Sequence, residues 1–279
     1  MTAVGVSGSG STCERLWALV REHTGEQYEV RPTSRGKGSD VTALVTCERG
    51  SFFVKACRNR PGGRRASIVR ERMVNPSVRA VSPALRWNAE DDAWIVLGFE
   101  VVEGRSSDFS LGSSDLPAVV GVLNSVRGLV VPDEVGDWRE TRWHRFADEG
   151  DRPHFLGDTL LFTDANPDNV MIGDRRTWLV DWSWPTVGAA FIAPACLVVQ
   201  LIAAGHTAEQ AEAWVVGCRG WAMADPAAID AFAIATVRMN RGQAERFPEA
   251  GWLGDMAEAA HLWAVHRGVS EAVTLGPSI

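Results

Sequence analysis

The apolar positions of this chain follow two periods, one typical of strands in its first part and one typical of helices towards its end. Short apolar runs bounded by Gly, Pro, Asn or Asp predict strands at residues 28–30, 41–47, 51–57, 84–87 and 93–97. Helical spacing predicts a short helix at 14–22 and another at 64–74. The first part of the chain is therefore predicted to form a small five-stranded sheet that packs with a helix.

The later part of the chain has mainly helical spacing. Residues 131–153 have no pattern that assigns a structure. Thr207 and Gln210 have the spacing of a capping box, and Asp225 precedes Pro226 as an N-cap precedes a first-turn proline. These signals predict helices at 115–127, 194–204, 208–219, 226–244 and 254–272.

Three polar residues adjoin the apolar runs 160–162 and 178–180. Asp164 and Asn169 follow the first run, and Asp181 follows the second. Gly and Asp at 173–176 favour a hairpin turn between the runs, which would set Asn169 opposite Asp181. Carboxylate and amide oxygens are the ligands that Mg²⁺ takes, usually together with substrate phosphates. The segment is therefore predicted to bind magnesium, although D-x-x-x-x-N alone would also fit a polar surface turn.

Composition restricts the possible classes of function. The 279 residues are 46% hydrophobic and 23% charged, as in ordinary globular proteins. The net charge of −7 argues against a nucleic-acid binder that depends on phosphate neutralisation. A cationic substrate would suit this surface, but the charge also serves solubility. We therefore expect no nucleic-acid partner.

The cysteines and the apolar segments indicate the compartment. The five cysteines contain no C-x-x-C pair, so neither a zinc site nor a disulfide framework is predicted. The N-terminus lacks the pattern of a secretory signal. The apolar stretch 187–205 is near the lower length limit for a membrane span and contains Pro194 and Gln200, which favours a buried helix. We expect a cytoplasmic protein without a membrane partner.

Lysine is rare in this chain, and its position is informative. Lys37 and Lys55 are the only lysines, and Lys55 lies inside the apolar strand 51–57. A compact ammonium acts as a point charge on phosphate groups. Lys55 is therefore a candidate phosphate ligand.

These segments together resemble the aminoglycoside phosphotransferase family, which has a protein-kinase-like fold. The similarity rests on D-x-x-x-x-N from Asp164 to Asn169, on a second Asp followed by Trp at Asp181, and on Lys55 in a strand like V-A-I-K. It implies an α+β fold of two lobes. Residues 1–103 would form a nucleotide-binding lobe with a small antiparallel sheet, and residues 104–279 a mainly helical catalytic lobe.

The resemblance also implies roles for individual residues. Asp164 would be the catalytic base, while Asn169 and Asp181 would bind Mg²⁺. Lys55 would contact the phosphates of ATP or GTP and pair with Glu71. Glu71 is the only acid of the helix 64–74, and it could equally be a solvated partner of nearby arginines.

Two further segments would hold the nucleotide by this resemblance. Gly36 and Gly38 would let the backbone of their loop approach the phosphates, although a flexible hairpin turn explains them equally well. Residues 98–104 resemble the hinge between kinase lobes, where the backbones of Glu100 and Val102 would meet adenine. The implied activity is Mg²⁺-assisted phosphorylation of a hydroxyl on an aminoglycoside, another sugar or an amino alcohol.

Two positions depart from the family pattern. The family usually has His two residues before the base, where this chain has Phe162, and an acid in a G-D-P-like segment, where this chain has Ala193. These departures motivate the alternative of a catalytically silent, kinase-like nucleotide-binding module. Mg²⁺-dependent ATP hydrolysis would distinguish the two hypotheses.

Overall fold

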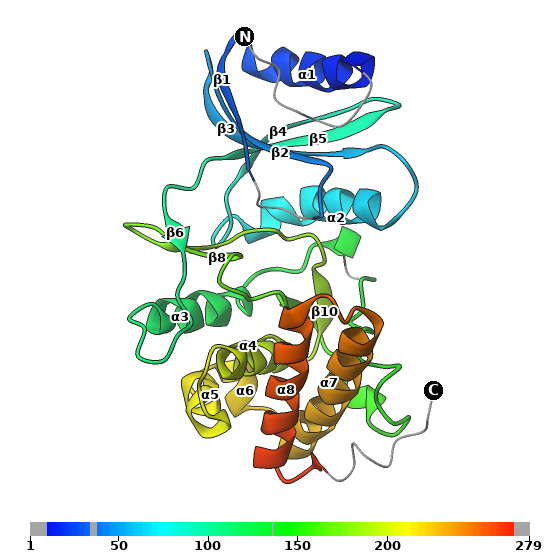
Figure 1. Cartoon of the computed structure of the whole chain (residues 1–279), viewed down its shortest axis with the longest axis vertical. Coiled ribbons are helices and arrows are strands. Elements are labelled where there is room, and N and C mark those ends of the chain that lie inside the picture. Colours follow the sequence, from blue (N-terminus) through cyan, green and yellow to red (C-terminus); the bar gives the residue numbers. More distant parts are fainter. Residues whose placement is uncertain (1–9, 34–37, 136, 271–279) are drawn as a thin grey trace. The chain divides into compact units, whose positions relative to one another are not determined.

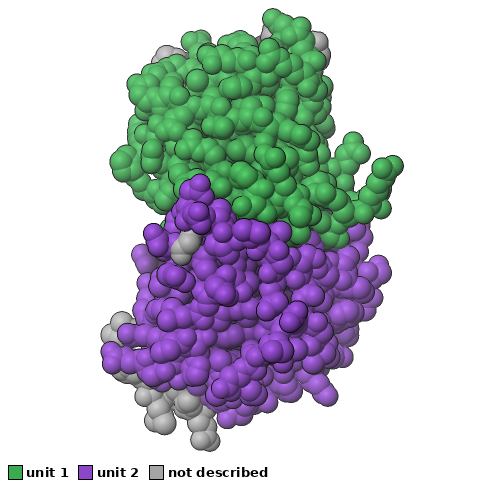
Figure 2. All heavy atoms as spheres, turned by 180° about the vertical axis from the view of Figure 1, so that it is seen from behind, with its two compact units in different colours: residues 1–104, 173–184 green, residues 105–172, 185–279 purple. Residues whose placement is uncertain are grey.

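The structure consists of two compact units, and each unit is formed by two separate stretches of the chain. It is a computed structural model that describes residues 10–33, 38–135 and 137–270. The first unit contains residues 1–104 and 173–184, and the second contains residues 105–172 and 185–279 (Figure 2). The chain thus returns to the first unit for one short segment. The division of the sequence into lobes 1–103 and 104–279 remains a prediction.

The first unit is built on a five-stranded antiparallel sheet. Its strand order is β1-β2-β3-β5-β4 (Figure 1). Its elements are α1 (Gly10–Thr24), β1 (Gln27–Pro32), β2 (Val41–Cys47), β3 (Gly50–Arg58), α2 (Gly63–Val78), β4 (Leu85–Glu90), β5 (Trp94–Glu100) and β9 (Thr177–Leu179). The predicted five-stranded sheet is confirmed.

Helices α1 and α2 cover opposite faces of this sheet (Figure 1). Side chains alternate between the faces of a strand, and β3 follows that rule. Val54 and Ala56 pack in one core cluster with Leu16 of α1, whereas Cys57 packs in a second cluster with Ile68 of α2. Because both faces are covered, the middle of β3 is buried on both sides. This alternation places Lys55 on the α2 face.

Strand β4 is longer than its sequence predicts. The connection between the predicted strands 84–87 and 93–97 is therefore shorter than expected, because Asn88 and Ala89 pair with Leu97 and Val96 of β5. The turn itself is fixed by Asp91, whose Oδ1 accepts the backbone N–H groups of residues 93 and 94 at 2.8 and 2.7 Å.

The second unit is mainly helical. Its elements are β6 (Arg105–Ser106), α3 (Leu116–Val126), the 3-10 turns η1 (Asp133–Val135) and η2 (Arg152–Phe155), β7 (Thr159–Leu161), β8 (Val170–Ile172), β10 (Thr186–Gly188), α4 (Ile192–Ala203), α5 (Ala208–Val215), α6 (Arg219–Ala222), α7 (Pro226–Arg246) and α8 (Gly251–His266). Strand β6 pairs antiparallel with β8, and β7 pairs antiparallel with β10.

Local signals define the starts of these helices better than their ends. Thr207 and Gln210 form the predicted capping box of α5, and Asp225 caps α7. The predicted extensions of two helices are wrong. Helix α5 ends at Val215 and a separate α6 follows, and α8 ends at His266 shortly before Gly268, whose φ of 73° favours glycine.

The predicted hairpin is only partly correct. Its turn forms, since the Gly173 N–H donates to the Arg176 carbonyl at 3.1 Å. The apolar run at its start pairs elsewhere, however: Leu161 and Leu160 of β7 face Thr186 and Val187 of β10. An apolar run identifies a strand but not its partner, and this partner follows later in the chain.

The apolar stretch 187–205 contains the buried helix α4, as expected, and its first two residues belong to β10. Most of its side chains lie in the core of the second unit. Within the described residues, no helix combines the length and the apolar character that crossing a membrane requires.

Close packing on β5 generates a stability prediction. A Cβ added to Gly98 would lie 2.1 Å from the Trp87 ring. That ring is held between His23, stacked with centroids 4.9 Å apart, and the edge of Phe52. Gly98→Ala should therefore lower the free energy of unfolding by about 1–3 kcal/mol, measured by urea denaturation.

Gly63→Ala in the same unit is the matched control. Gly63 begins α2, and an added Cβ there would meet only the Trp184 ring at 4.0 Å. Stability should stay equal or rise slightly, because alanine favours helix. Equal stability of both variants would contradict the packing argument.

Candidate functional site

Lys55 of the first unit makes two buried ion pairs. Its Nζ lies 2.7 Å from Oε2 of Glu71 and 2.9 Å from Oδ1 of Asp181. The side chains of Lys55 and Glu71 are 5% and 6% exposed, and that of Asp181 is 24% exposed. The structure thus contains the Lys55–Glu71 pair that the resemblance implies, and it adds Asp181 to that pair.

Three different elements supply these side chains. Lys55 points from β3 towards α2, and Glu71 lies on the buried side of α2. Asp181 follows β9, and the backbone N–H of its neighbour Trp182 bonds to the Glu71 carboxylate. The solvated alternative for Glu71 is excluded by its burial.

The charges in this cluster shift one another's pKa values. Burial lowers the pKa of Lys55, but the two carboxylate charges outweigh it and the pKa is raised. Burial raises the pKa of Glu71, and Lys55 offsets only part of that effect. Burial alone would raise the pKa of Asp181, but the Lys55 charge and a hydrogen bond from Ser183 outweigh burial, so the pKa of Asp181 is lowered. With all three groups ionised, the cluster carries one excess negative charge.

The backbone at Asp181 has an uncommon conformation. Its φ is 63°, which among the described residues is the only positive φ outside glycine. The Trp182 indole N–H donates to the Leu179 carbonyl at 3.2 Å, and the Ser183 hydroxyl donates to Oδ1 of Asp181. Ser183 was not predicted from the sequence. These contacts hold the Asp181 side chain beside Lys55.

Asp164 of the second unit lies in a loop closed by two amides. Its Oδ1 accepts from Nδ2 of Asn166 at 2.9 Å, and its Oδ2 accepts from Nδ2 of Asn169 at 2.8 Å. Asn166 Oδ1 also accepts the backbone N–H of Asp168 and Asn169. Asp164 itself is exposed. Asn166 was not predicted, although the Asn-Pro dipeptide at 166–167 is a turn signal that could have identified it.

The oxygen atoms of Asn169 and Asp181 suit a hard cation. Both donor contacts of the Asn169 amide go to Asp164, and in the described part of the chain no hydrogen bond reaches its Oδ1. Lys55 and Ser183 both use Oδ1 of Asp181, which leaves Oδ2 for a ligand. Mg²⁺ needs only one or two such protein ligands when phosphates supply others. The donor set fits magnesium, and the approach of these residues from two units remains a prediction.

Protein side chains alone do not form a metal cage in the described residues. No group of three or more His, Cys, Asp or Glu there could hold a metal ion.

The structure says less about the other residues that were predicted to contact the nucleotide. Gly36 lies outside the described residues. Gly38 is exposed, and a Cβ there would meet nothing within 4 Å. The Glu100 N–H already donates to the Ala84 carbonyl, and its carboxylate pairs with Arg86 at 2.5 Å. Adenine recognition by Glu100 and Val102 remains a prediction.

Both departures from the family pattern are buried and apolar. Phe162 and Ala193 are 3% and 6% exposed in the core of the second unit. Polar contacts reach the loop that carries Asp164 from another segment instead: Arg142, paired with Glu140, donates to Thr163 at 2.7 Å. The sequence did not nominate these residues, because their segment has no periodic pattern.

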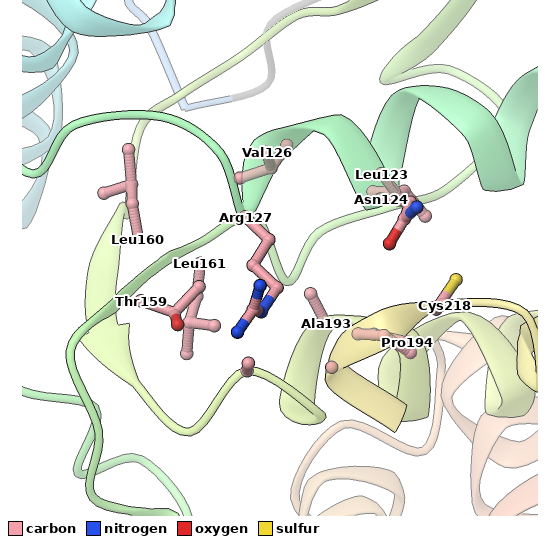
Figure 3. Close-up of a pocket in the computed structure, with 12 residues that line it drawn as sticks. Leu123, Asn124, Val126, Arg127, Thr159, Leu160, Leu161, Ala193, Pro194 and Cys218 are labelled. Carbon is pink, nitrogen blue, oxygen red and sulfur yellow. The ribbon is translucent and has the colours of Figure 1, made fainter. Parts of the chain in front are cut away.

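A small cavity in the second unit is too small for an acceptor. Its volume is about 20 Å³, and Leu123, Leu161 and Ala193 are among the residues that line it (Figure 3). A cavity of this size holds about one water molecule.

Comparisons with solved structures identify the fold. No protein-family model and no curated protein matches the sequence. Choline kinase LicA from Streptococcus pneumoniae is similar with a TM-score of 0.60 and 11% identity, over 91% of this chain and 99% of that chain. Aminoglycoside phosphotransferase from Alicyclobacillus acidocaldarius has a TM-score of 0.61 and 12% identity, over 92% and 96%.

A third similar structure contains ligands. A thermostable mutant of aminoglycoside phosphotransferase APH(4)-Ia, solved with AMP-PNP and hygromycin B, has a TM-score of 0.54 and 13% identity, over 92% of this chain and 97% of that chain. LicA was also solved with AMP. These likenesses confirm the predicted α+β, kinase-like fold of the aminoglycoside phosphotransferases and choline kinase.

The buried ion pairs generate a second stability prediction. Lys55→Met leaves the Glu71 carboxylate buried without a cation, so the free energy of unfolding should fall by about 3–5 kcal/mol. The double variant Lys55→Met/Glu71→Leu removes both charges and should recover part of that loss. Urea denaturation of the wild type, both single variants and the double variant measures the coupling. Additive effects would contradict the pairing.

Proposed function

We propose that this protein transfers the γ-phosphoryl group of a nucleoside triphosphate to a hydroxyl of a small molecule. The observation that carries the proposal is the buried Lys55, shared between Glu71 and Asp181 at 2.7 and 2.9 Å. One carboxylate is enough to neutralise a buried lysine, and Lys55 contacts two. When all three groups are ionised, the excess negative charge suits a divalent cation that enters with nucleotide phosphates.

Each residue has a distinct role in this reaction. Lys55 binds the nucleotide phosphates, and Glu71 holds Lys55 in place. Asn169 Oδ1 and Asp181 Oδ2 would each offer an oxygen ligand to Mg²⁺, which would supply charge neutralisation at the phosphates. Asp164 accepts the proton of the acceptor hydroxyl as its oxygen bonds to the γ-phosphorus. The bond from that phosphorus to the bridging oxygen breaks, and the nucleoside diphosphate leaves.

The solved structures with a similar fold support the class of ligands. LicA was solved with AMP and the APH(4)-Ia mutant with AMP-PNP, which favours ATP over GTP as the donor. The similar structures also include a choline kinase and an aminoglycoside phosphotransferase bound to hygromycin B, and choline and aminoglycosides combine hydroxyls with positively charged nitrogen. With the net charge of −7, a cationic alcohol is the favoured acceptor.

Calorimetry and turnover of ATP test the nucleotide site. ATP should bind only with Mg²⁺, more tightly than GTP, and Asp181→Asn should abolish that dependence because Asp181 is a metal ligand. Asp164→Asn should keep the binding but slow Mg²⁺-dependent ATP hydrolysis by about 10²–10⁴-fold, since it removes a general base.

Asp174→Asn, an exposed acid in the turn after β8, is the control and should behave as wild type. Binding without any turnover in the wild type would favour the alternative, a catalytically silent nucleotide-binding module. Absence of binding at millimolar ATP and GTP would contradict both functions.

Paired acceptors test the preference for a cation. Choline and its uncharged isostere 3,3-dimethylbutanol differ in one charge, as do ethanolamine and ethylene glycol. The cation of each pair should accelerate ADP release at least about tenfold over its neutral partner, because a compensated charge is worth more than about 1.4 kcal/mol in a desolvated site. Equal rates within both pairs would contradict a cationic acceptor.

A further inference from the structure

We propose that the ion pair of Glu140 and Arg142 positions the catalytic loop that carries Asp164. The inference rests on the proposed phosphotransferase function, and it assigns a role to a segment that sequence patterns left unassigned. Arg142 acts through Thr163, the residue directly before Asp164, so it is a positioning residue and not a catalytic one.

Glu140 is a fixed, buried anchor. Its side chain is 1% exposed, and it accepts hydrogen bonds from the Arg142 backbone N–H at 2.8 Å and from the Thr186 hydroxyl at 2.6 Å. Its own N–H donates to the Val187 carbonyl at 2.9 Å. Burial alone would raise the pKa of Glu140, but the hydrogen bonds and charge of Arg142 outweigh burial, and the pKa is lowered. Glu140 is therefore an anion at neutral pH.

The approach of Glu140 to β10 depends on a glycine. A Cβ on Gly188 would lie 2.9 Å from Cβ of Glu140 and 3.0 Å from the Leu161 side chain. Because β10 pairs with β7, and β7 leads directly into the catalytic loop, Glu140 is attached to the strand pair from which the loop emerges.

Arg142 connects this anchor to the loop. Its Nε donates to both oxygens of Glu140 at 3.0 and 3.1 Å, and its Nη2 donates to the Thr163 hydroxyl at 2.7 Å. Its guanidinium also lies over the Trp143 ring, 5.0 Å from the centroid. Trp143 is itself tied to Thr236 of α7 at 3.1 Å. Glu140 and the Trp143 ring thus hold the planar guanidinium of Arg142, while its Nη2 reaches Thr163.

The loop has polar contacts on both sides of Asp164. Asn166 and Asn169 hold the carboxylate itself from the following residues. On the preceding side, Phe162 is apolar, and Arg142 supplies the contact through Thr163. The positive charge of Arg142 also interacts with the negative charge of the Asp164 carboxylate. Phosphoryl transfer depends mainly on positioning, so a contact of this kind should affect turnover.

Thr163→Val tests the contact most directly. It removes the hydroxyl that Arg142 reaches and leaves the Glu140–Arg142 pair intact. We expect kcat for Mg²⁺-dependent ATP hydrolysis, followed as ADP release, to fall on the order of 10²-fold because Asp164 is displaced. The KM for ATP, the calorimetric affinity for Mg·ATP and the melting temperature should stay as in the wild type.

Variants of the ion pair provide the second test. Arg142→Met alone would leave Glu140 buried without a partner, so Glu140→Gln/Arg142→Met, which removes both charges, is measured beside it. Both should lower kcat as Thr163→Val does. Combining Arg142→Met with Thr163→Val should add little further loss, because both break the same contact. Arg142→Lys keeps one cation and should recover part of kcat.

Arg139→Met is the matched control. Arg139 is exposed in the same segment and donates to the Gly157 carbonyl at 3.2 Å, without a contact to the catalytic loop. It should leave kcat unchanged.

The outcomes separate this inference from the proposed function. Wild-type protein without Mg²⁺-dependent ATP turnover would overturn both. An active wild type whose Thr163→Val and Glu140→Gln/Arg142→Met variants keep wild-type kcat would overturn the positioning role alone. A change in KM with constant kcat would also overturn it, since the ion pair would then affect nucleotide binding and not the alignment of Asp164.

Discussion

The candidate nucleotide site depends on burying one ammonium group between two carboxylates. Removing charges from water costs several kcal/mol for each ion, so such a group is stable only when its partners are held in place. Strand β3 provides Lys55 on one covered face of the sheet, α2 provides Glu71 on the opposing surface, and the returning segment 173–184 provides Asp181. The packing of these elements in the first unit therefore fixes the positions of the three charged groups.

In the second unit, Asp164 is held in a different way. In the proposed reaction Asp164 must stay exposed enough to meet a hydroxyl, so burial cannot hold it. Hydrogen bonds hold it instead: Asn166 and Asn169 on the carboxylate, and Arg142 through Thr163 on the preceding residue. Arg142 in turn depends on Glu140, which is buried beside β10. An exposed reactive group is thus supported by a buried charge two contacts away.

Fold and function rest on different kinds of evidence in this protein. Structures with 11–13% identity share its fold, which many sequences can adopt because binary patterning and core volume are sufficient for it. Activity depends on a few side chains at particular distances. Lys55, Glu71 and Asp181 have such an arrangement within one unit, and Asp164 and Asn169 have one within the other. The loss of polar groups at 162 and 193 coincides with a different support for the loop.

The sequence by itself determined the elements and the identity of the main candidate residues. Alternation and turn residues predicted the five strands, capping signals predicted the starts of α5 and α7, and a rare lysine in an apolar strand identified Lys55. These features are local, and neighbouring residues are sufficient to produce them. Only the tertiary structure decided that β7 pairs with β10, that 173–184 belongs to the first unit, and that Arg142, Asn166 and Ser183 contact the candidate residues or their neighbours. Those contacts join groups whose partners depend on packing and hydrogen-bond geometry, and no periodicity in the chain encodes them.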